Sequence, residues 1–364
     1  MQLKEVIAFL EKYAPVSSQA SFDNCGLLIG DKNADLTGVL VCLDCTEEVL
    51  DEAIEKGANL VIAHHPLIFK GLKKITGRNY VERTVIKAIQ NNLAVYAIHT
   101  NLDHSIKGVN AEIARRLEIE SPRILLPQEN VLTKLSVFVP SNHAGTVERA
   151  MFAAGAGAIG NYSECSFQTE GIGAFKPEAG ADPFEGKIGM RTKTPEVKIE
   201  VLVSNHVLPK VLHAMTEAHP YEEVAHDIIA LKNVNKEEGS GMIGMLKDPV
   251  DAQTFLARLK QTFHCGVIRH TVLTGKKIQH VAFCGGAGSF LLPEAMAQKA
   301  DIFITGDYKY HEFFDADEQL IIADIGHYES EQFTTNLIVA VLTENFAKFA
   351  VHHTRINTNP INYF

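Results

Sequence analysis

The sequence lacks several features that would assign it to a specialised class of protein. No apolar run in its 364 residues approaches the ~18 that a membrane-spanning helix requires. Residues 1–12 carry acidic side chains within their apolar stretch and lack the layout of a secretory signal. The six cysteines are scattered without a framework of spacings, as expected where thiols stay reduced. These absences predict a soluble, cytoplasmic protein with no membrane partner.

An excess of basic residues is also missing. The formal net charge is −10, with 34 Lys and Arg against 44 Asp and Glu. A protein that binds nucleic acid through its phosphates needs a basic surface, so this charge disfavours that class. Hydrophobic residues make up 46% of the chain and charged residues 21%, which is an ordinary globular composition. The length predicts two or three domains.

The most informative segment is a short apolar run, residues 59–63, that is followed by His64, His65 and a proline. A β-branched run of this length predicts a buried strand, so both histidines stand at its carboxyl end. In open α/β sheets, ligands bind at that edge. Adjacent strand residues point to opposite faces, so the two imidazoles suit two neighbouring metals better than one. The alternative is one core histidine and one histidine that caps a loop.

The first part of the chain alternates strands and helices. We predict strands over 38–43, 59–63 and 94–98, and helices over 3–13, 46–56, 80–91 and 108–117. This succession implies right-handed βαβ units and an α/β fold with a mostly parallel sheet flanked by helices. Residues 70–77 form a basic, glycine-containing loop that either covers the presumed site or is a solvated connector. Cys42 and Cys45 have a suggestive spacing but no second pair, so we expect buried structural thiols.

The pattern changes in the middle of the chain. There we expect strands over 133–139, 164–169, 197–204 and 223–231, and helices over 144–155 and 207–218. A glycine-rich hairpin region, 170–190, lies between the second and third of these strands, so the elements run strand, helix, strand, hairpin region, strand, helix, strand. This order predicts an inserted ferredoxin-like α+β domain, residues 131–239, within a discontinuous α/β domain formed by 1–130 and 240–364. The charged, glycine-bearing stretch 236–241 is typical of a linker. The insert's four histidines without ligand spacing are expected at the surface or an interface: His206, His213, His219 and His226.

The α/β alternation returns after residue 240. We predict helices over 250–262, 289–299 and 328–348, and strands over 266–273, 279–284, 301–305 and 319–323. The glycine-rich turn 284–289 joins a strand to a helix and could offer backbone N–H groups to an anion. It lacks the lysine of a P-loop and the spacing of a dinucleotide fingerprint.

Further candidate ligands follow other strands of the predicted sheet. His99 and Asp103 follow the strand at 94–98, although Asp103 stands just before a helix and could be only its cap. His327 and Glu331 follow the last strand, and their spacing of four places both side chains on one helical face. We therefore expect three imidazoles and two carboxylates at one sheet edge, contributed by His64, His65, Asp103, His327 and Glu331.

Nitrogen and oxygen ligands without thiolate suit zinc, iron(II), manganese or cobalt, and the residue types do not choose among these metals. Five ligands suit two divalent ions that share a bridging carboxylate. Such a pair acidifies a bridging water to a hydroxide that attacks an ester, amide, amidine or phosphate group. Four further residues are candidates to orient a ligand histidine or to relay a proton: His99, Asp307, His311 and Asp324.

The chain resembles the NIF-three-like proteins, also labelled GTP cyclohydrolase I type 2, in their long YqfO-like form. The resemblance covers essentially the whole chain and rests on Asp23-Asn24-x-Gly26-Leu27, His64-His65-Pro66, His99-Thr100-Asn101-Leu102-Asp103, Thr305-Gly306-Asp307 and Gly326-His327-Tyr328-x-x-Glu331. It implies that His64, His65, Asp103, His327 and Glu331 bind two metals. It also implies a toroidal homohexamer built from trimers, and an insert similar to PII/CutA-like modules around residues 220–224. Phe22 departs from the tryptophan that many members carry before Asp-Asn.

Two functions follow from these observations. The first is a metal-dependent hydrolase that uses a metal-bound hydroxide on a nucleotide-like or other small cyclic substrate, and the cyclohydrolase label alone does not make GTP that substrate. The second is a non-catalytic, metal-dependent assembly or regulatory ring protein in which the insert senses a ligand. Nucleic-acid binding through the cavity of a ring would need a basic lining, and the acidic charge disfavours it.

Overall fold

The protein, described by a computed structural model over residues 1–364, divides into two compact units. The larger unit combines Met1–Leu126 with Glu237–Phe364, and the smaller unit is Pro127–Lys236. Strands β5 (Glu120–Gln128) and β10 (Asn235–Val250) carry the chain across the two boundaries. The stretch 236–241, predicted to be a linker, is therefore part of a strand. Its backbone is held by hydrogen bonds from Ile106 N to Glu237 O (2.9 Å) and from Gly239 N to His104 O (2.9 Å).

The first sheet of the larger unit has the strand order β1-β4-β3-β2-β15. Its strands are β1 (Gly26–Ile29), β2 (Gly38–Cys42), β3 (Leu60–Ala63), β4 (Ala94–Ala97) and β15 (Ala350–His353). The last four of these are parallel, and β1 pairs antiparallel with β4 at one edge. Strands β2, β3 and β4 are buried along their whole length, as parallel strands covered on both faces should be.

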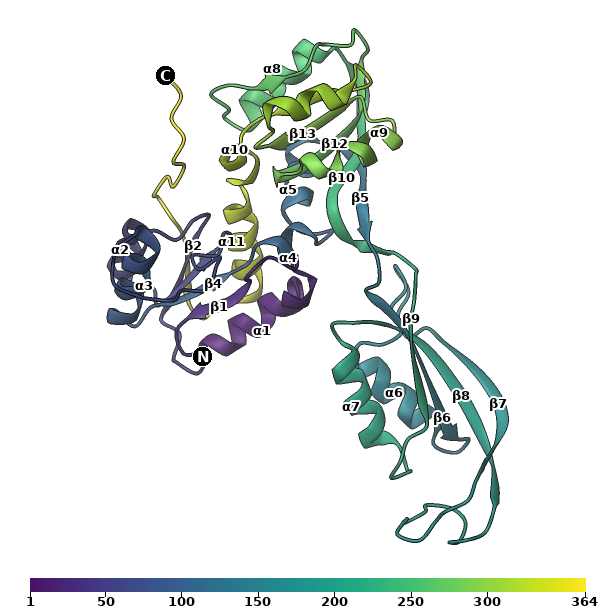
Figure 1. The fold of residues 1–364 in the computed structure, drawn as a ribbon. Helices are drawn as coiled ribbons and strands as arrows, with labels where there is room; N and C mark the ends of the chain where they lie inside the picture. The colour runs from purple at the N-terminus through teal and green to yellow at the C-terminus, as the bar shows by residue number, and fades with distance from the viewer. The chain divides into compact units, whose positions relative to one another are not determined.

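Helices cover both faces of this sheet (Figure 1). The apolar side of α1 (Leu3–Tyr13) packs on one face, and α2 (Glu47–Glu55) and α3 (Tyr80–Gln90) pack on the other. Thr46 caps α2, because its hydroxyl accepts a hydrogen bond from Val49 N. These helices hold the strands rigidly, so that their carboxyl ends form a fixed edge.

A second sheet completes the larger unit and corrects the expectation of a single sheet. Its order is β11-β14-β13-β12-β10-β5, with β11 (Arg269–His270), β12 (Ile278–Ala287), β13 (Ile302–Gly306) and β14 (Ile321–Asp324). Strands β12, β13 and β14 are parallel. One continuous apolar core joins the two sheets through α5 (Val109–Leu117), α8 (Ala252–Thr262) and α11 (Thr334–Asn345). The alternation of strands and helices does not show which strands pair with one another. The presence of two sheets could therefore not be predicted from the sequence.

Other predicted elements differ in extent from those observed. The long helix expected over 328–348 is two helices, α10 (His327–Glu331) and α11. At the break, Gln332 Nε2 donates to the carbonyls of Glu329 and Phe263. The strand expected over 266–273 shrinks to β11. Short helices not predicted or only partly predicted are α4 (Thr100–Asp103), α9 (Leu292–Ala297) and the 3-10 helices Val16–Ser18, Ser289–Leu291 and Tyr310–Ala316.

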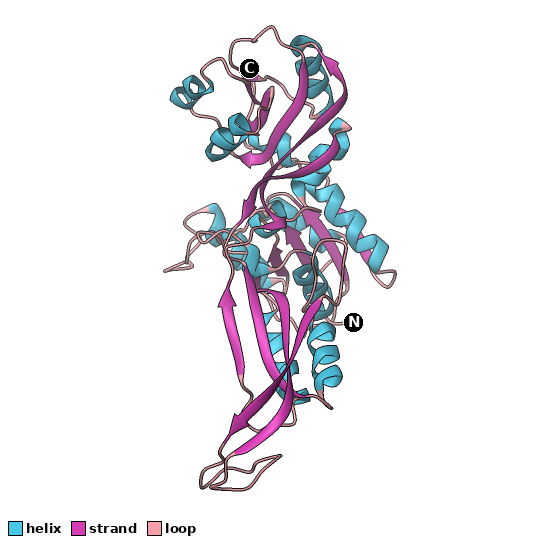
Figure 2. Cartoon of the chain, turned by 90° about the vertical axis from the view of Figure 1, so that its right-hand side faces the viewer, coloured by secondary structure: helices cyan, strands magenta, loops and turns pink.

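The smaller unit has the order β6 (Leu132–Pro140), α6 (Ala144–Ala154), β7 (Ser166–Phe175), β8 (Thr192–Ser204), α7 (Leu208–Ala218), β9 (His226–Ala230). Its strands form one antiparallel sheet in the order β7-β8-β6-β9, and both helices pack on one face of it (Figure 2). The predicted hairpin region 170–190 is partly strand, since β7 runs on to Phe175. None of the helices in either unit has the length and apolar character needed to cross a membrane.

Candidate metal centre

The two adjacent histidines lie at the carboxyl end of β3, as predicted. His64 is fully buried, and its Nδ1 lies 2.8 Å from the carbonyl of Ile98. Because a carbonyl only accepts, Nδ1 carries the hydrogen, and Nε2 keeps its lone pair in the neutral ring. His65 is partly exposed, with Nδ1 2.7 Å from Asp44 Oδ1 and Nε2 2.9 Å from Glu331 Oε2. Each ring is thus fixed through Nδ1 and turns Nε2 toward the same space.

His99 and Asp103 follow the next strand, β4. Asp103 Oδ1 lies 3.6 Å from His64 Nε2, which is too far for a hydrogen bond. Both atoms are buried and have no hydrogen-bond partner. A buried polar atom without a partner costs free energy, so this gap is where a cation would satisfy both groups. The ring centroid of His99 lies 5.3 Å from those of His64 and His65, so His99 also borders the cluster.

The second sheet supplies the opposite side of the cluster, from the turn between β14 and α10. Gly326 makes this turn with φ 96°, and a Cβ at Gly306 would approach His327 N to 2.8 Å. Both glycines therefore let the start of α10 lie close against the end of β13. His327 and Glu331 then share one face of α10, as their spacing predicted.

The glycine-rich stretch 284–289, which forms the end of β12 and the residues just after it, has a different role from the anion site considered in the sequence. Three of its backbone N–H groups are already used, because Gly285 donates to Asn110, Gly286 to Ser330 and Gly288 to Thr305. A Cβ at Gly286 would collide with the Glu331 carboxylate. The stretch thus makes room for Glu331 rather than offering N–H groups to an anion.

Glu331 is the carboxylate that connects the two halves of the cluster. It is buried, its Oε2 lies 2.9 Å from His65 Nε2 and 3.1 Å from His327 Nε2, and its Oε1 lies 3.8 Å from His64 Nε2. Three groups of side chains here bring their ligand atoms within 4.8 Å of one another. They are His64 with Asp103 and Glu331, His65 with His327 and Glu331, and His64 with His65 and His99. Each is able to hold a metal ion.

The electrostatics of the cluster are set by Glu331. Burial lowers the pKa of His65, but hydrogen bonds to Asp44 and Glu331 outweigh it and raise the pKa to about 10. Burial likewise lowers the pKa of His327, while the charge of Glu331 raises it to about 9. Burial and then the Glu331 charge raise the pKa of Asp103 to about 7. Protons therefore neutralise the buried negative charge in this state, and a cation would supply the same compensation.

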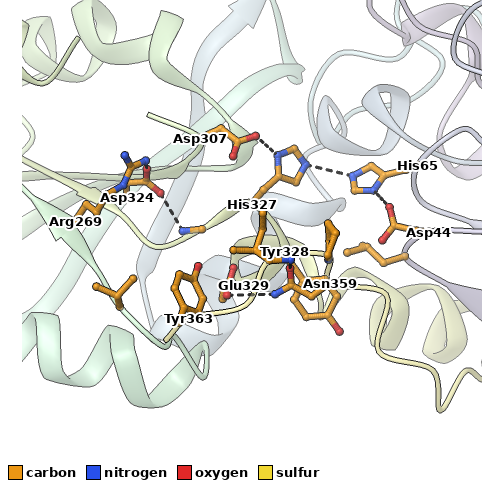
Figure 3. A pocket seen from close by; sticks show the side chains of 15 residues that line it. Asp44, His65, Arg269, Asp307, Asp324, His327, Tyr328, Glu329, Asn359 and Tyr363 are labelled. Carbon is orange, nitrogen blue, oxygen red and sulfur yellow. Dashed lines mark hydrogen bonds and ion pairs between the residues drawn. The ribbon is translucent and has the colours of Figure 1, made fainter. Parts of the chain in front are cut away.

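Of the four residues predicted to orient ligands or relay protons, two face the cluster. Asp307 Oδ2 lies 2.8 Å from His327 Nδ1 (Figure 3), and His99 Nδ1 lies 2.9 Å from Asp23 Oδ1. Asp324 instead anchors the turn, because it pairs with Arg269 and accepts from Tyr308 N and Gly326 N. His311 is exposed on the 3-10 helix and contacts Tyr310 edge to face, so the structure does not bring it to the cluster.

Two carboxylates at the site were not predicted to act there, although Asp23 belongs to the first motif on which the family resemblance rests. Asp44 follows β2 and fixes His65, while Asp23 holds His99 and accepts from Thr100 N (3.0 Å) and the Thr100 hydroxyl. Asp44 stands at a strand end like the other site residues, and this position was a signal that could have identified it. Asp23 comes from the turn before β1, and no spacing relates it to His99.

A cavity of about 510 Å³ opens beside His65 and His327. Its walls include Asp44, Tyr328 and Glu329, and also the C-terminal residues Asn359 and Tyr363 (Figure 3). No cysteine belongs to the groups that could hold a metal ion: all six are free and five are buried, and burial raises the pKa of Cys45 to about 12. Cys42 and Cys45 are therefore structural thiols, as expected. Cys25 meets the site only through its thiol, which donates to Asp23 Oδ2 at 3.2 Å.

Known proteins resemble this chain over most or all of its length. A GTP cyclohydrolase 1 type 2 homolog from Halalkalibacterium halodurans is 41% identical over 324 residues, which is 88% of this chain and 87% of the relative. The homolog of the same name from Bacillus subtilis is 37% identical over 366 residues, covering 99% of this chain and 98% of the relative. A crystal structure of a Bacillus cereus protein related to NIF3 shares 36% identity and a TM-score of 0.86, with 100% of this chain and 99% of that chain covered.

The sequence profile of the family described as Duf34/NIF3 (NGG1p interacting factor 3) matches residues 1–360. The resemblance recognised in the sequence motifs is therefore confirmed, and the chain belongs to the DUF34/NIF3 family.

Proposed function

We propose that the larger unit is a dinuclear metal-dependent hydrolase centre. The observation that carries this proposal is the pair of buried, unpartnered atoms His64 Nε2 and Asp103 Oδ1, which face each other across 3.6 Å. A cation bound between them would give both atoms the partner that they lack. The residues fit two ions, one held by His64, Asp103 and Glu331 and the other by His65, His327 and Glu331.

When bound, two such ions acidify a shared water and polarise the group that it attacks. The chain's own residues prepare this chemistry. Asp44 and Asp307 hold the Nδ1 atoms of His65 and His327, and the Ile98 carbonyl holds that of His64, so each ligand atom is preoriented. The pair of His99 and Asp23 stands at the border of the cluster, where it can accept and return a proton.

The substrate we propose is a nucleotide-like or other small cyclic molecule. The cavity beside His65 and His327 has room for such a molecule, and Tyr328, Asn359 and Tyr363 offer ring faces and an amide to it. The relatives' name, GTP cyclohydrolase 1 type 2 homolog, makes GTP the first substrate to test. We place the protein in the cytoplasm, where its six free cysteines would stay reduced.

We also propose that the smaller unit is an inserted ferredoxin-like domain of the PII/CutA-like kind, and that the chain forms a homohexameric ring built from trimers. Support for the first comes from the βαββαβ order and the antiparallel sheet. Support for the second is the sheet face opposite the helices. It carries Phe167 and Ile229, which are 67% and 51% exposed. Exposed apolar side chains of this kind, set among the charged Lys134 and Glu200, favour association with further copies.

Elemental analysis of the purified protein tests the metal centre. We expect about two transition-metal ions per chain in the wild type, and fewer in both His64→Ala and Glu331→Ala. His311→Ala is the matched control, because that exposed histidine lies outside the cluster and its loss should leave the metal content unchanged. Absence of metal after reconstitution with zinc, iron(II) or manganese would overturn the proposal.

Turnover and assembly are measured on the same samples. Hydrolysis of GTP or another cyclic amidine that disappears in Glu331→Ala, with the assembly intact, would support the hydrolase. Metal binding without turnover would instead favour the non-catalytic, metal-dependent ring protein. Light scattering should give a mass six times that of the 40.0 kDa chain, and a monomer would contradict the ring.

A further inference from the structure

The smaller unit contains a cavity of its own, about 380 Å³ in volume. It lies between the end of β7, the loop that follows it, strand β8 and the segment 221–225. All of its lining residues belong to the unit Pro127–Lys236, and none is a candidate metal ligand. The cavity is therefore a separate feature that the proposed hydrolase does not explain.

Three aromatic rings line this cavity. The Tyr221 ring lies between Phe175 and Phe184, with centroid separations of 5.9 Å and 6.1 Å and interplanar angles of 60° and 50°. The rings are tilted toward one another rather than stacked. His219 and His143 contact Tyr221 and Phe184 edge to face, with centroid separations of 5.0 Å and 5.4 Å. Phe184 is 49% exposed although other rings are close by. Aromatic faces carry negative quadrupole charge and attract cations, most strongly when several rings surround one position.

The cavity wall is negatively charged, and it would therefore attract cations as the aromatic rings do. Five glutamates and a single lysine line it, and that lysine, Lys176, is already paired with Glu178 at 3.4 Å. Glu196 is the best-fixed carboxylate, because its Oε1 accepts from the Tyr221 hydroxyl at 3.0 Å. A Cβ at Gly173 would collide with this carboxylate, so the glycine in β7 keeps its place open. The cavity thus combines three aromatic rings with a wall that carries more glutamates than lysines.

These features distinguish between classes of ligand. Anions are disfavoured by the glutamates, and a neutral apolar molecule would leave their charge unbalanced. A bare metal ion is disfavoured too, because every group of side chains whose ligand atoms converge within 4.8 Å lies in the larger unit. A large, weakly hydrated organic cation is the class that uses both the ring faces and the carboxylates. We propose that this cavity binds an organic cation through an alkylammonium group.

Choline and its neutral isostere 3,3-dimethylbutan-1-ol test the proposal, because they share a shape and differ in charge. Both are titrated into the full-length protein and followed by calorimetry or ligand-detected NMR. We expect choline to bind about tenfold more tightly than the isostere or better. Equal binding of the two would show a merely apolar cavity and overturn the proposal. No binding of choline would overturn it as well.

Variants place the binding in this cavity. Glu196→Gln and Phe175→Leu should each weaken choline binding severalfold, since one removes a charge and the other a ring face. Glu217→Gln is the matched control, because Glu217 is an exposed glutamate of α7 outside the cavity. The isostere's weak affinity should be unchanged in Glu196→Gln, which separates loss of charge from loss of folding. Equal choline affinity in all of these variants would contradict the assignment. Displacement of choline by Mg²⁺ more than by NaCl of equal ionic strength would contradict it as well.

Discussion

At the scale of single residues, Asp44 links the candidate metal centre to the C-terminal segment. Its Oδ1 lies 2.7 Å from His65 Nδ1, and its Oδ2 accepts from the Thr358 hydroxyl at 2.6 Å. Burial raises the pKa of Asp44, but the hydrogen bond from His65 outweighs it, so the pKa lies below its usual range. Asp44 is therefore a charged acceptor that fixes the orientation of His65 without being a ligand.

Replacing Asp44 should weaken metal binding without removing a ligand. In Asp44→Ala, His65 loses the acceptor that orients it, and we expect metal affinity to fall by about 10-fold to 100-fold. Competition with a chromophoric chelator measures the change. Asp51→Ala is the matched control, since this exposed aspartate of α2 pairs only with Lys87 and its loss should leave the affinity unchanged. Similar losses in both variants would mean that Asp44 does not act through His65.

Most of the single residues in the candidate site could be predicted from the sequence. His64, His65, Asp103, His327 and Glu331 were predictable because each follows a buried strand or shares a helix face with a residue that does. Asp324 also lies at the end of a strand, but its side chain pairs with Arg269. The direction of this side chain depends on the conformation of the turn that follows, which residue spacing does not encode. His311 was proposed because it lies close to Asp307 in the sequence. In the structure it belongs to the 3-10 helix Tyr310–Ala316 and lies outside the cluster.

At the scale of elements, the segment after β15 is attached to the larger unit through a buried carboxylate. Glu52 on α2 accepts from the Thr354 hydroxyl at 2.5 Å and from Arg355 N at 3.1 Å. Burial raises the pKa of Glu52, but these hydrogen bonds and the charge of Lys56 outweigh it and lower the pKa. The segment then passes Asp44 and reaches the cavity through Asn359 and Tyr363. Glu52 thus anchors a wall of the candidate substrate cavity.

Glu52→Gln should destabilise the protein in a pH-dependent way. A carboxyl whose folded pKa is lowered contributes stability above its unfolded pKa, and this contribution is lost as the pH falls. We expect the variant to lower the free energy of unfolding by about 1 to 3 kcal/mol at neutral pH, with the difference shrinking below about pH 4.5. Denaturant titrations at several pH values measure it.

The control for this anchor lies on the same helix. Glu55 is exposed, so Glu55→Gln should be neutral at every pH. Hydrogen exchange at residues 354–364 should increase in Glu52→Gln only. A pH-independent difference between Glu52→Gln and the wild type would show that the carboxylate charge is not what holds the segment.

Prediction from the sequence was uneven among the elements. Helices α1, α2 and α3 were placed within a residue or two because caps and apolar periodicity are local signals. Strand β15 was missed, since its four residues pair with β2, which lies more than 300 positions earlier in the chain. The break between α10 and α11 depends on a side chain reaching Phe263, and helical periodicity does not register that contact.

At the scale of the whole molecule, the candidate metal centre joins two sheets of the larger unit. His64, His65 and Asp103 follow strands of the first sheet, and His327 and Glu331 follow a strand of the second. The sequence placed all five at one edge of one sheet. The site was nevertheless predicted because the rule that ligands gather at carboxyl ends holds for each sheet separately.

Removing the metal should therefore loosen the larger unit as a whole and spare the smaller one. A ligand at about 1,000 times its Kd stabilises the folded state by about 4 kcal/mol, and here that stabilisation would tie together residues far apart in sequence. We expect a chelator to lower the melting temperature and to speed hydrogen exchange in β3 and β14. Exchange in β6 and β8 should stay unchanged, because that unit has its own core. In Glu331→Gln the chelator should have little effect, since the shared carboxylate is already lost. Faster exchange in both units, or an unchanged melting temperature in the wild type, would mean that no metal joins the two sheets.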